Sequence, residues 1–421
     1  MKNKIKISVA TPVQQHSYKT AIALKKSNCL KMYHTTVYYQ EKKLLYKLLR
    51  SILSKNNRER MLHKRANELD SDVKTSKSLL GLIYLLVIRY DKAKNITPFF
   101  KRILCKSFSY SVYHELKKND INMLIMNDLM ACETFERVKK HHAPTILVLD
   151  MASVPATYIR NIIDFEKASN DPFKEDLEAF DKSFALKYMK FYKKEINLAD
   201  YFFAACNFTK DKLIEYGIEA EKIYYLPLGV DIINFPEKKK YKIEKTIKFL
   251  FVGRVEAAKG VYYLLEAFKQ CPNLPVELII AGEVNCDVAL YSDCDNITFL
   301  GAVNKTKMPE LYQSADVYVL SSLWEGFSLS LFEAMASGLP VIASENSCAP
   351  DVISEGIQGF VYNPLDICTL KSKVEWYVNN VEMIEVMGKN AHKLAEKYNW
   401  TVYEMRLNEI IEDIAQKEGL I

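Results

Sequence analysis

The sequence predicts an α/β protein with two doubly wound, Rossmann-like domains that face each other across a cleft. Three observations support this fold class. Segments with the apolar pattern of strands alternate with helical segments twice along the 421 residues, a length that suits two domains. A charged stretch at 236–245, PEKKKYKIEK, separates the two series and reads as a linker. Residues 321–340, SSLWEGFSLSLFEAMASGLP, join a strand end to a sharply bounded helix.

The N-terminal series begins with the strand-like segment ISVA. Strands are expected at 5–10, 30–39, 123–126, 145–149 and 201–205, with a closing segment at 222–227. Helices are expected at 18–26 and across 155–196, and basic, largely helical sequence fills 41–118. The apolar run at 79–88, LLGLIYLLVI, is too short to span a bilayer and indicates a buried helix or an interfacial one, of which we favour the buried helix.

The C-terminal series repeats the pattern. Strands are expected at 247–252, 276–281, 297–300, 317–320 and 341–343, and helices at 261–269, 307–314, after Ser328 and in three segments from about 367. Repeated βα units imply parallel sheets covered by helices on both faces. We therefore expect an acceptor-binding domain at 1–235, a nucleotide-sugar-binding domain at 246–398, and a final helix at 399–421 that packs back towards the first domain.

Composition limits the class of protein. Hydrophobic residues make up 49% of the chain and charged residues 26%, as in ordinary soluble domains. Nine scattered cysteines, with no CxxC pair, favour reduced thiols over a disulfide framework and give no zinc motif. The start MKNKIKISVATP lacks the apolar core of a signal peptide, so a cytoplasmic location is expected.

The positive charge is concentrated in one region. Residues 41–120 contain 19 Lys and Arg against 8 Asp and Glu, whereas the whole chain has a net charge of +6. Such a region suits an anionic membrane surface on the inner face of the membrane, or a phosphate-bearing acceptor. Solvated helix faces explain it equally well. Nucleic acid is a weaker alternative, because no binding motif for it is present.

Two carboxylates stand out in the 321–340 segment. Glu325 comes just after a strand, and Glu333 falls inside a helix, about two turns after Glu325. Ser328 can cap this helix, and Gly338 and Pro340 end it. Backbone N–H groups at the start of such a helix bind anions. Carboxylates can bind the hydroxyl groups of a sugar, and backbone amides can bind phosphate. Together they predict a site for a sugar nucleotide. The alternative is an amphipathic helix with two solvated glutamates.

A second loop offers cations at the same sheet edge. The stretch FVGRVEAAKG places Gly253 after a strand, with Arg254 and Lys259 before the next helix. Two fixed cations can neutralise a diphosphate, most strongly as it leaves with increasing charge. Neither GxGxxG nor GxxxxGK[ST] is present, which argues against a dinucleotide-binding Rossmann motif and a P-loop NTPase.

Together these motifs resemble the retaining GT-B glycosyltransferases of family four, often called group 1. The resemblance rests on VGRVEAAKG, ITFLGAV and EGFSLSLFEAMASGLPVIAS in that order and covers about 245–365, with weaker support from NLADYFFAACNFTKDKLIEYG and YLPLGVD at 197–231. It implies a transfer of sugar from a nucleoside diphosphate donor to a glycan or lipid-linked acceptor, in cell-surface polysaccharide synthesis. It implies no metal and no other cofactor.

The resemblance also implies a role for each matching residue. Arg254 and Lys259 would hold the donor diphosphate, and Gly253 would be a further donor-binding position. Glu333 would bind the ribose hydroxyls, and Glu325 the hydroxyls of the donor sugar. The remaining implied contacts are backbone groups: the amides of Gly326, Phe327 and Ser328 towards the sugar, those of Leu329 and Ser330 towards phosphate, and Ala302 and Val303 towards the base.

The N-terminal half departs from the family pattern. The family usually has a glycine-rich first loop, but here this loop reads ATPVQQHSYKT, with Gln14 and His16 in place of glycines. The family often has a histidine after a strand in the middle of this domain, and here Asp150 or Ser153 occupies that place. His16 is our candidate for a catalytic residue from this half, although it could equally cap or pack a helix start. His141 and His142 precede a strand on its amino-terminal side, so we expect them to lie away from the site.

Other functions remain open at this point. A sugar-nucleotide epimerase of related fold would act without an acceptor, but its own motifs are not apparent. A glycan phosphorylase would need a cofactor lysine and a much longer chain. A non-catalytic sugar-nucleotide-binding or assembly protein is a third alternative, and the presence of Arg254, Lys259, Glu325 and Glu333 argues against it.

Overall fold

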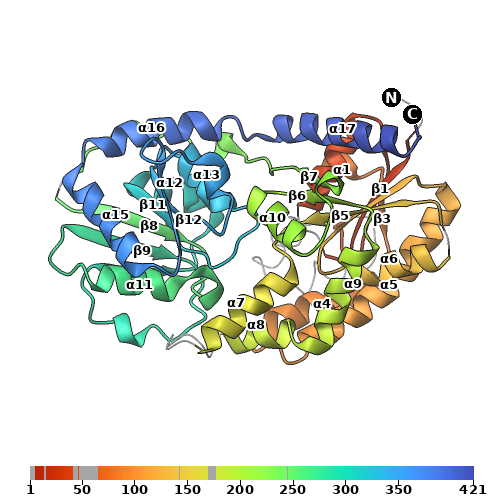
Figure 1. Cartoon of the computed structure of the whole chain (residues 1–421), viewed down its shortest axis with the longest axis horizontal. Helices are drawn as coiled ribbons and strands as arrows, with labels where there is room; N and C mark the ends of the chain where they lie inside the picture. The colour runs from red at the N-terminus through yellow and green to blue at the C-terminus, as the bar shows by residue number, and fades with distance from the viewer. Residues whose placement is uncertain are drawn as a thin grey trace.

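The computed structural model describes residues 5–13, 16–40, 46, 65–141, 143–168, 177–243 and 245–421. These residues form two α/β lobes, each built on one parallel sheet with helices on both faces (Figure 1). The two doubly wound sheets confirm the predicted fold class.

The N-terminal lobe has a seven-stranded sheet in the order β3-β2-β1-β4-β5-β6-β7. Its strands are β1 Ile7–Thr11, β2 Leu30–Thr35, β3 Val73–Thr75, β4 Met123–Asn127, β5 Ile146–Met151, β6 Tyr201–Ala204 and β7 Ile223–Tyr225. Its helices are α1 Ser17–Lys26, α4 Ser78–Tyr90, α5 Thr97–Asn119, α6 Cys132–Lys140, α7 Ala156–Ala168, α8 Leu177–Ser183, α9 Leu186–Leu198 and α10 Asn207–Glu215.

The C-terminal lobe has a six-stranded sheet in the order β10-β9-β8-β11-β12-β13. Its strands are β8 Ile247–Val252, β9 Val276–Ala281, β10 Ile297–Gly301, β11 Val317–Leu320, β12 Val341–Ser344 and β13 Gly359–Tyr362. Its helices are α11 Val261–Lys269, α12 Met308–Ser314, α13 Leu329–Ala336, α14 Ala349–Val352, α15 Ile367–Asn379, α16 Met383–Ala395 and α17 Trp400–Lys417, with a helical turn η5 at Ala257–Lys259.

The strand order reverses direction at a central strand in each sheet. β1 lies between β2 and β4, and β8 lies between β9 and β11. In doubly wound sheets, ligands bind beyond the carboxyl ends of the strands at this reversal. The loops that follow β8 and β11 are the ones that carry the VGRVEAAKG and EGF motifs, so the fold places both motifs at the reversal point.

Several boundaries differ from the sequence-based expectations. The second strand ends at Thr35 rather than at 39, and the short edge strands β3 and β13 were not expected. The apolar run at 79–88 forms α4, but only Gly81 and Tyr84 in this helix are buried, so the prediction of a buried helix is wrong for most of its surface. The basic stretch at 41–64 lies, apart from Tyr46, outside the described residues.

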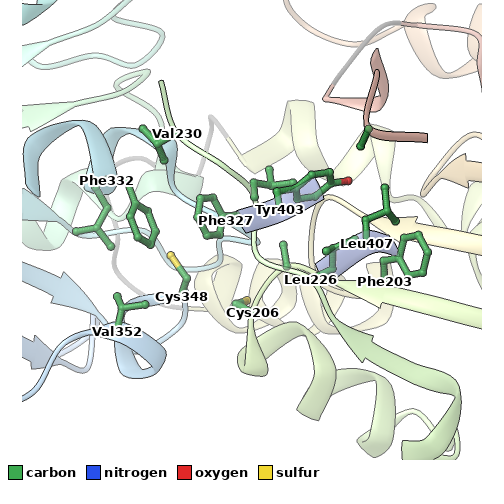
Figure 2. Close-up of a cluster of buried hydrophobic side chains, with 14 of the residues drawn as sticks. Phe203, Cys206, Leu226, Val230, Phe327, Phe332, Cys348, Val352, Tyr403 and Leu407 are labelled. Atoms are coloured by element: carbon green, nitrogen blue, oxygen red, sulfur yellow. The ribbon is translucent and has the colours of Figure 1, made fainter. Parts of the chain in front are cut away.

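A continuous apolar core joins the two lobes. Phe203 and Leu226 of the N-terminal lobe, Phe327 and Phe332 of the C-terminal lobe, and Leu407 of α17 belong to one buried cluster (Figure 2). The rings of Phe327 and Phe332 stack with centroids 4.6 Å apart. Phe327 is the last residue of the turn Glu325-Gly326-Phe327, which we call the EGF turn. This core therefore holds the EGF turn against the N-terminal lobe.

The chain passes between the lobes twice, and the two passages touch. α16 packs on α13 in the C-terminal lobe, and α17 continues across to pack on α1 (Figure 1). The Val230 N–H donates to the Tyr398 carbonyl at 2.8 Å. A β-carbon on Gly229 would lie 2.6 Å from the backbone of Trp400, so only glycine allows this close approach. The predicted linker at 236–245 is held against the C-terminal lobe, because the Tyr241 hydroxyl donates a hydrogen bond to the Gly338 carbonyl oxygen at 2.9 Å.

No helix among those described carries an apolar stretch long enough to cross a bilayer.

We predict that Leu407→Ala lowers the free energy of unfolding by about 2–5 kcal/mol, because it removes a fully buried side chain from the interlobe core. Urea denaturation of purified protein measures the change. Met405→Ala, on the exposed side of the same helix, is the control and should change the free energy by less than about 0.5 kcal/mol. Equal effects of the two substitutions would contradict the assignment of this core.

Candidate functional site

Glycines bring the loop after β8 against its neighbours. Gly260 has φ +62, and a β-carbon there would lie 1.9 Å from the Ser321 carbonyl oxygen. The Ser321 hydroxyl donates to the Lys259 carbonyl at 2.7 Å, and the Leu323 N–H donates to the Ala258 carbonyl at 3.1 Å. These contacts fix the AAKG turn on the carboxyl end of β11. The side chain of Lys259 therefore lies beside the EGF turn.

Lys259 and Glu325 form an ion pair between the two motifs. The Lys259 ammonium donates to Glu325 Oε2, and the Ser322 hydroxyl donates to the same oxygen at 3.2 Å. The side chains remain 23% and 19% exposed. A partly exposed pair of this kind can exchange its internal contact for contacts with a ligand, whereas a fully buried pair cannot do so cheaply. The structure thus brings together two of the predicted site residues.

The helix start after Glu325 has the predicted cap. The Ser328 hydroxyl accepts from the Leu331 N–H at 3.4 Å, and Gly338, with φ +83, follows the last turn of α13. Both capping predictions are confirmed. Leu329 is the first residue of α13, and Ser330 accepts a hydrogen bond from the Tyr318 hydroxyl at 2.7 Å. The amide groups of this first turn are therefore presented next to Glu325.

Arg254 is the most exposed of the predicted cations. Its side chain is 58% exposed, and Nη2 lies 3.0 Å from Glu256 Oε1. Burial raises the pKa of Glu256, and Arg254, Lys259 and Lys94 oppose this rise. Burial lowers the pKa of Lys94, and the positive charge of Arg254 lowers it further. Three cations therefore act electrostatically on one carboxylate, and Lys94 comes from the N-terminal lobe.

Lys94 was missed by the sequence reasoning. In the sequence it is one of the 19 basic residues between 41 and 120, and no motif distinguishes it. The structure places its loop against the C-terminal lobe, where the neighbouring Lys92 lies 3.4 Å from Glu283. Only the packing of the two lobes could identify it.

Glu333 lies in α13 and is held by a tyrosine. The Tyr312 hydroxyl donates to Glu333 Oε2 at 2.9 Å. Burial raises the pKa of Glu333, and the hydrogen bond from Tyr312 and the charge of Lys305 oppose the rise. Val303 follows β10 and packs at the margin of the apolar core that contains Tyr312.

In the N-terminal lobe, His16 pairs with Asp150. His16 Nε2 lies 2.8 Å from Asp150 Oδ2, and both side chains are largely buried. Burial alone lowers the pKa of His16, but the charge of Asp150, its hydrogen bond and the charge of Asp128 outweigh burial, so the pKa is raised. The structure therefore pairs the two departures from the family pattern with each other.

Asp128 is a second residue that the sequence reasoning missed. It follows β4, its Oδ1 accepts from the Ala152 N–H at 3.3 Å, and burial with the nearby Asp150 raises its pKa to about 7. A β-carbon on Gly326 would lie 2.2 Å from the Ala152 carbonyl oxygen and 3.1 Å from Ser153 Cα. The loop after β5 thus links the His16–Asp150 pair to the EGF turn.

His141, which we expected to lie away from the site, directly follows α6, and its ring centroid lies 4.9 Å from that of Tyr113. Gln14 and His142 are outside the described residues. In the ranges that the structure describes, no group of three or more His, Cys, Asp or Glu side chains could hold a metal ion.

Comparison with known proteins identifies the C-terminal motifs. Residues 234–394 match the sequence family described as "Glycosyl transferases group 1". The sulfoquinovosyl transferase SQD2 of Arabidopsis thaliana is 31% identical over 36% of this chain, and the O-antigen chain mannosyltransferase B of Escherichia coli is 24% identical over 46% of it. These matches span 30% and 52% of the length of the two relatives.

Solved structures are similar over nearly the whole chain. The sucrose-phosphate synthase of Thermosynechococcus elongatus matches with a TM-score of 0.68 at 14% identity, over 98% of this chain and all of that one. Anabaena HepE in complex with UDP matches with a TM-score of 0.61 at 15% identity, over 97% of this chain and all of that one. Residues 234–394 are therefore similar to the group 1 glycosyltransferases, and the two lobes have the GT-B fold.

Proposed function

We propose that this protein is a retaining glycosyltransferase that moves a sugar from a nucleoside diphosphate donor to a glycan or lipid-linked acceptor. The observation that carries the proposal is the Lys259–Glu325 ion pair, which joins the two family motifs at the reversal point of the C-terminal sheet. One of its members suits a phosphate and the other suits sugar hydroxyls.

The donor would bind mainly to the C-terminal lobe. Arg254 and Lys259 would hold the diphosphate, with the amides of Leu329 and Ser330 at the start of α13 as further donors. Gly253, which follows β8 without a side chain, would leave room for the phosphates. The complexes of Anabaena HepE with UDP and with UDP-glucose support this class of donor for the fold.

The sugar and the nucleoside would occupy opposite sides of the phosphates. Glu325 and the amides of Gly326, Phe327 and Ser328 would bind the sugar. Glu333 would accept hydrogen bonds from the ribose hydroxyls, and the backbone at Val303 would contact the base. Because burial raises the pKa of Glu333, a ribose hydroxyl that donates to its carboxylate would favour the charged form again.

In the reaction, the bond between the anomeric carbon and the diphosphate oxygen breaks, and a bond from an acceptor hydroxyl oxygen forms on the same face. The acceptor proton passes to the departing phosphate oxygen. Arg254 and Lys259 would stabilise the negative charge that grows on the diphosphate. The contact of Gly326 with the loop after β5 would exclude water that otherwise hydrolyses the donor. His16 and Asp150 would face the acceptor from the N-terminal lobe.

An anionic membrane surface is the partner that we propose for the N-terminal lobe. Leu79, Ile83, Leu86 and Tyr90 are exposed along α4 at spacings of four, three and four residues, which places them on one face of the helix. α5 packs beside α4 and exposes Phe99 and Ile103 (Figure 1).

Exposed apolar rows of this size mark interaction surfaces. We define the Leu79–Ile103 surface as these six residues. Lys77 directly before α4, Arg89 of α4 and Lys106 of α5 are exposed, so positive charge accompanies the apolar groups. This combination suits acidic lipid headgroups and would place a lipid-linked acceptor, used in cell-surface polysaccharide synthesis, near the enzyme on the cytoplasmic side.

We predict that Glu333→Ala and Arg254→Ala each reduce donor binding or turnover at least about tenfold, because each loses a charge-assisted contact. Isothermal titration with candidate nucleotide sugars and a donor-hydrolysis assay measure the two quantities. Glu310→Ala, which removes an exposed glutamate of α12, is the matched control and should behave as wild type. Unchanged kinetics in either test variant would remove that residue from the site.

We predict that transfer continues in about 5 mM EDTA, an excess of roughly five-thousandfold over about 1 μM enzyme, since Arg254 and Lys259 would supply the positive charge that a metal supplies elsewhere. The measurement is the initial rate with and without the chelator. A rate that falls at least about tenfold and returns with added Mg²⁺ or Mn²⁺ would overturn the metal-free mechanism.

We predict that the protein sediments with vesicles containing 30% (roughly one lipid in three) anionic phosphatidylglycerol at low salt, and less so as the salt concentration rises. The double variant Leu79→Glu/Leu86→Glu should lower the bound fraction at least about fivefold. Leu290→Glu, at an equally exposed leucine of the C-terminal lobe, is the control. Equal sedimentation of the two variants would exclude the Leu79–Ile103 surface as the contact.

A further inference from the structure

A cavity of about 270 Å³ lies at the β3 edge of the N-terminal sheet. His34 at the end of β2, Lys74 of β3 and Ser76 line one side of it. The other side is formed by α5, through Tyr110, Ser111, His114 and Glu115. None of these residues belongs to the proposed donor site or to the contacts between the lobes. The cavity therefore has no role in the transfer as described so far.

One wall of the cavity contains an incompletely paired histidine. His34 is fully buried, and its Nε2 lies 2.8 Å from the Ser76 hydroxyl. In the described part of the chain, its Nδ1 is buried without a hydrogen-bond partner. Burial lowers the pKa of His34 to about 4, so the ring is neutral near pH 7. Because His34 itself has no exposed surface, the polar side chains that this wall offers to a ligand are those of Lys74, which is exposed, and Ser76, which is partly exposed.

The charges at the cavity compensate each other. Lys74 Nζ lies 3.2 Å from Glu115 Oε1, and the charge of Lys74 helps to lower the pKa of Glu115 against the opposing effect of burial. With His34 neutral, the lining presents hydrogen-bond donors and acceptors but little net charge. This favours a neutral ligand with several hydroxyl groups over a phosphate or a carboxylate.

An aromatic ring stands at the edge of the cavity. The side chain of Tyr110 is 54% exposed, and the Arg137 guanidinium lies 3.4 Å from its ring centroid. This cation–π contact holds the ring in place. A fixed, partly exposed ring beside paired charges and hydroxyls can pack against the C–H groups of a sugar ring while its hydroxyls are hydrogen-bonded.

We infer that this cavity binds one neutral pyranose residue. Its volume is just below the range of about 300–1,000 Å³ that is usual for drug-sized ligands, so it suits a single ring rather than a longer chain. The inference extends the proposed function, because the bound sugar would be a residue of the acceptor glycan. The site would hold that glycan on the N-terminal lobe while another part of it reacts.

Saturation-transfer NMR of the full chain tests the inference with four probes: glucose, galactose, mannose and N-acetylglucosamine. We expect saturation to pass from the protein to at least one of these four sugars. Ser111→Trp, which fills the cavity with an indole ring, should abolish this transfer, and Tyr110→Ala should weaken binding at least about fivefold. Phe165→Ala, at an equally exposed aromatic residue of α7 outside the cavity, is the matched control and should bind as wild type.

Two further measurements separate this site from the donor site. Glu325→Ala should retain the sugar signal, because Glu325 does not line the cavity. Ser111→Trp should keep the wild-type rate of donor hydrolysis, which also shows that this variant is folded. The inference is wrong if no sugar receives saturation from wild-type protein, or if a folded Ser111→Trp variant still binds it. Loss of donor hydrolysis in Glu325→Ala, by contrast, tests only the proposed transferase activity.

Discussion

The shared apolar core between the lobes is the constraint on which the rest of the site depends. Phe327 lies in this core, and Glu325 and Gly326 directly precede it in the chain. The core therefore holds the EGF turn against the loop after β5. This turn carries Glu325, the residue predicted to bind the donor sugar. Neither lobe alone could hold this turn in the same way, because the side chains that bury Phe327 come from both lobes and from α17 (Figure 2).

The electrostatics of the site follow from this placement. Cations from two lobes act electrostatically on Glu256, and the carboxylate of Glu325 pairs with Lys259. In the absence of a ligand, these charges compensate each other internally. A diphosphate would compete for the cations and would release Glu325 for a sugar hydroxyl. The same arrangement can thus be stable when empty and selective for a ligand that carries negative charge and hydroxyls together.

The sequence predicted the C-terminal lobe better than the N-terminal one, for physical reasons. Capping residues and glycines are local signals, and Ser328, Gly338 and the strand before Glu325 were read correctly from them. The pairing of His16 with Asp150 joins positions 134 residues apart, and no local pattern encodes it. Likewise, α4 looked like a buried helix because its composition is apolar, whereas burial depends on which neighbours cover it.

The touching passages at Gly229–Val230 and Tyr398–Trp400 have a mechanical consequence. Two adjacent connections behave as a hinge with one axis, so the least costly relative motion of the lobes is a clamshell rotation about that line. Sliding or twisting would instead shear the Val230–Tyr398 hydrogen bond. A side chain at position 229 would act as a wedge in the hinge, since there is no space for a β-carbon beside Trp400. Any larger residue at this position would therefore force the two connections apart and displace the start of α17.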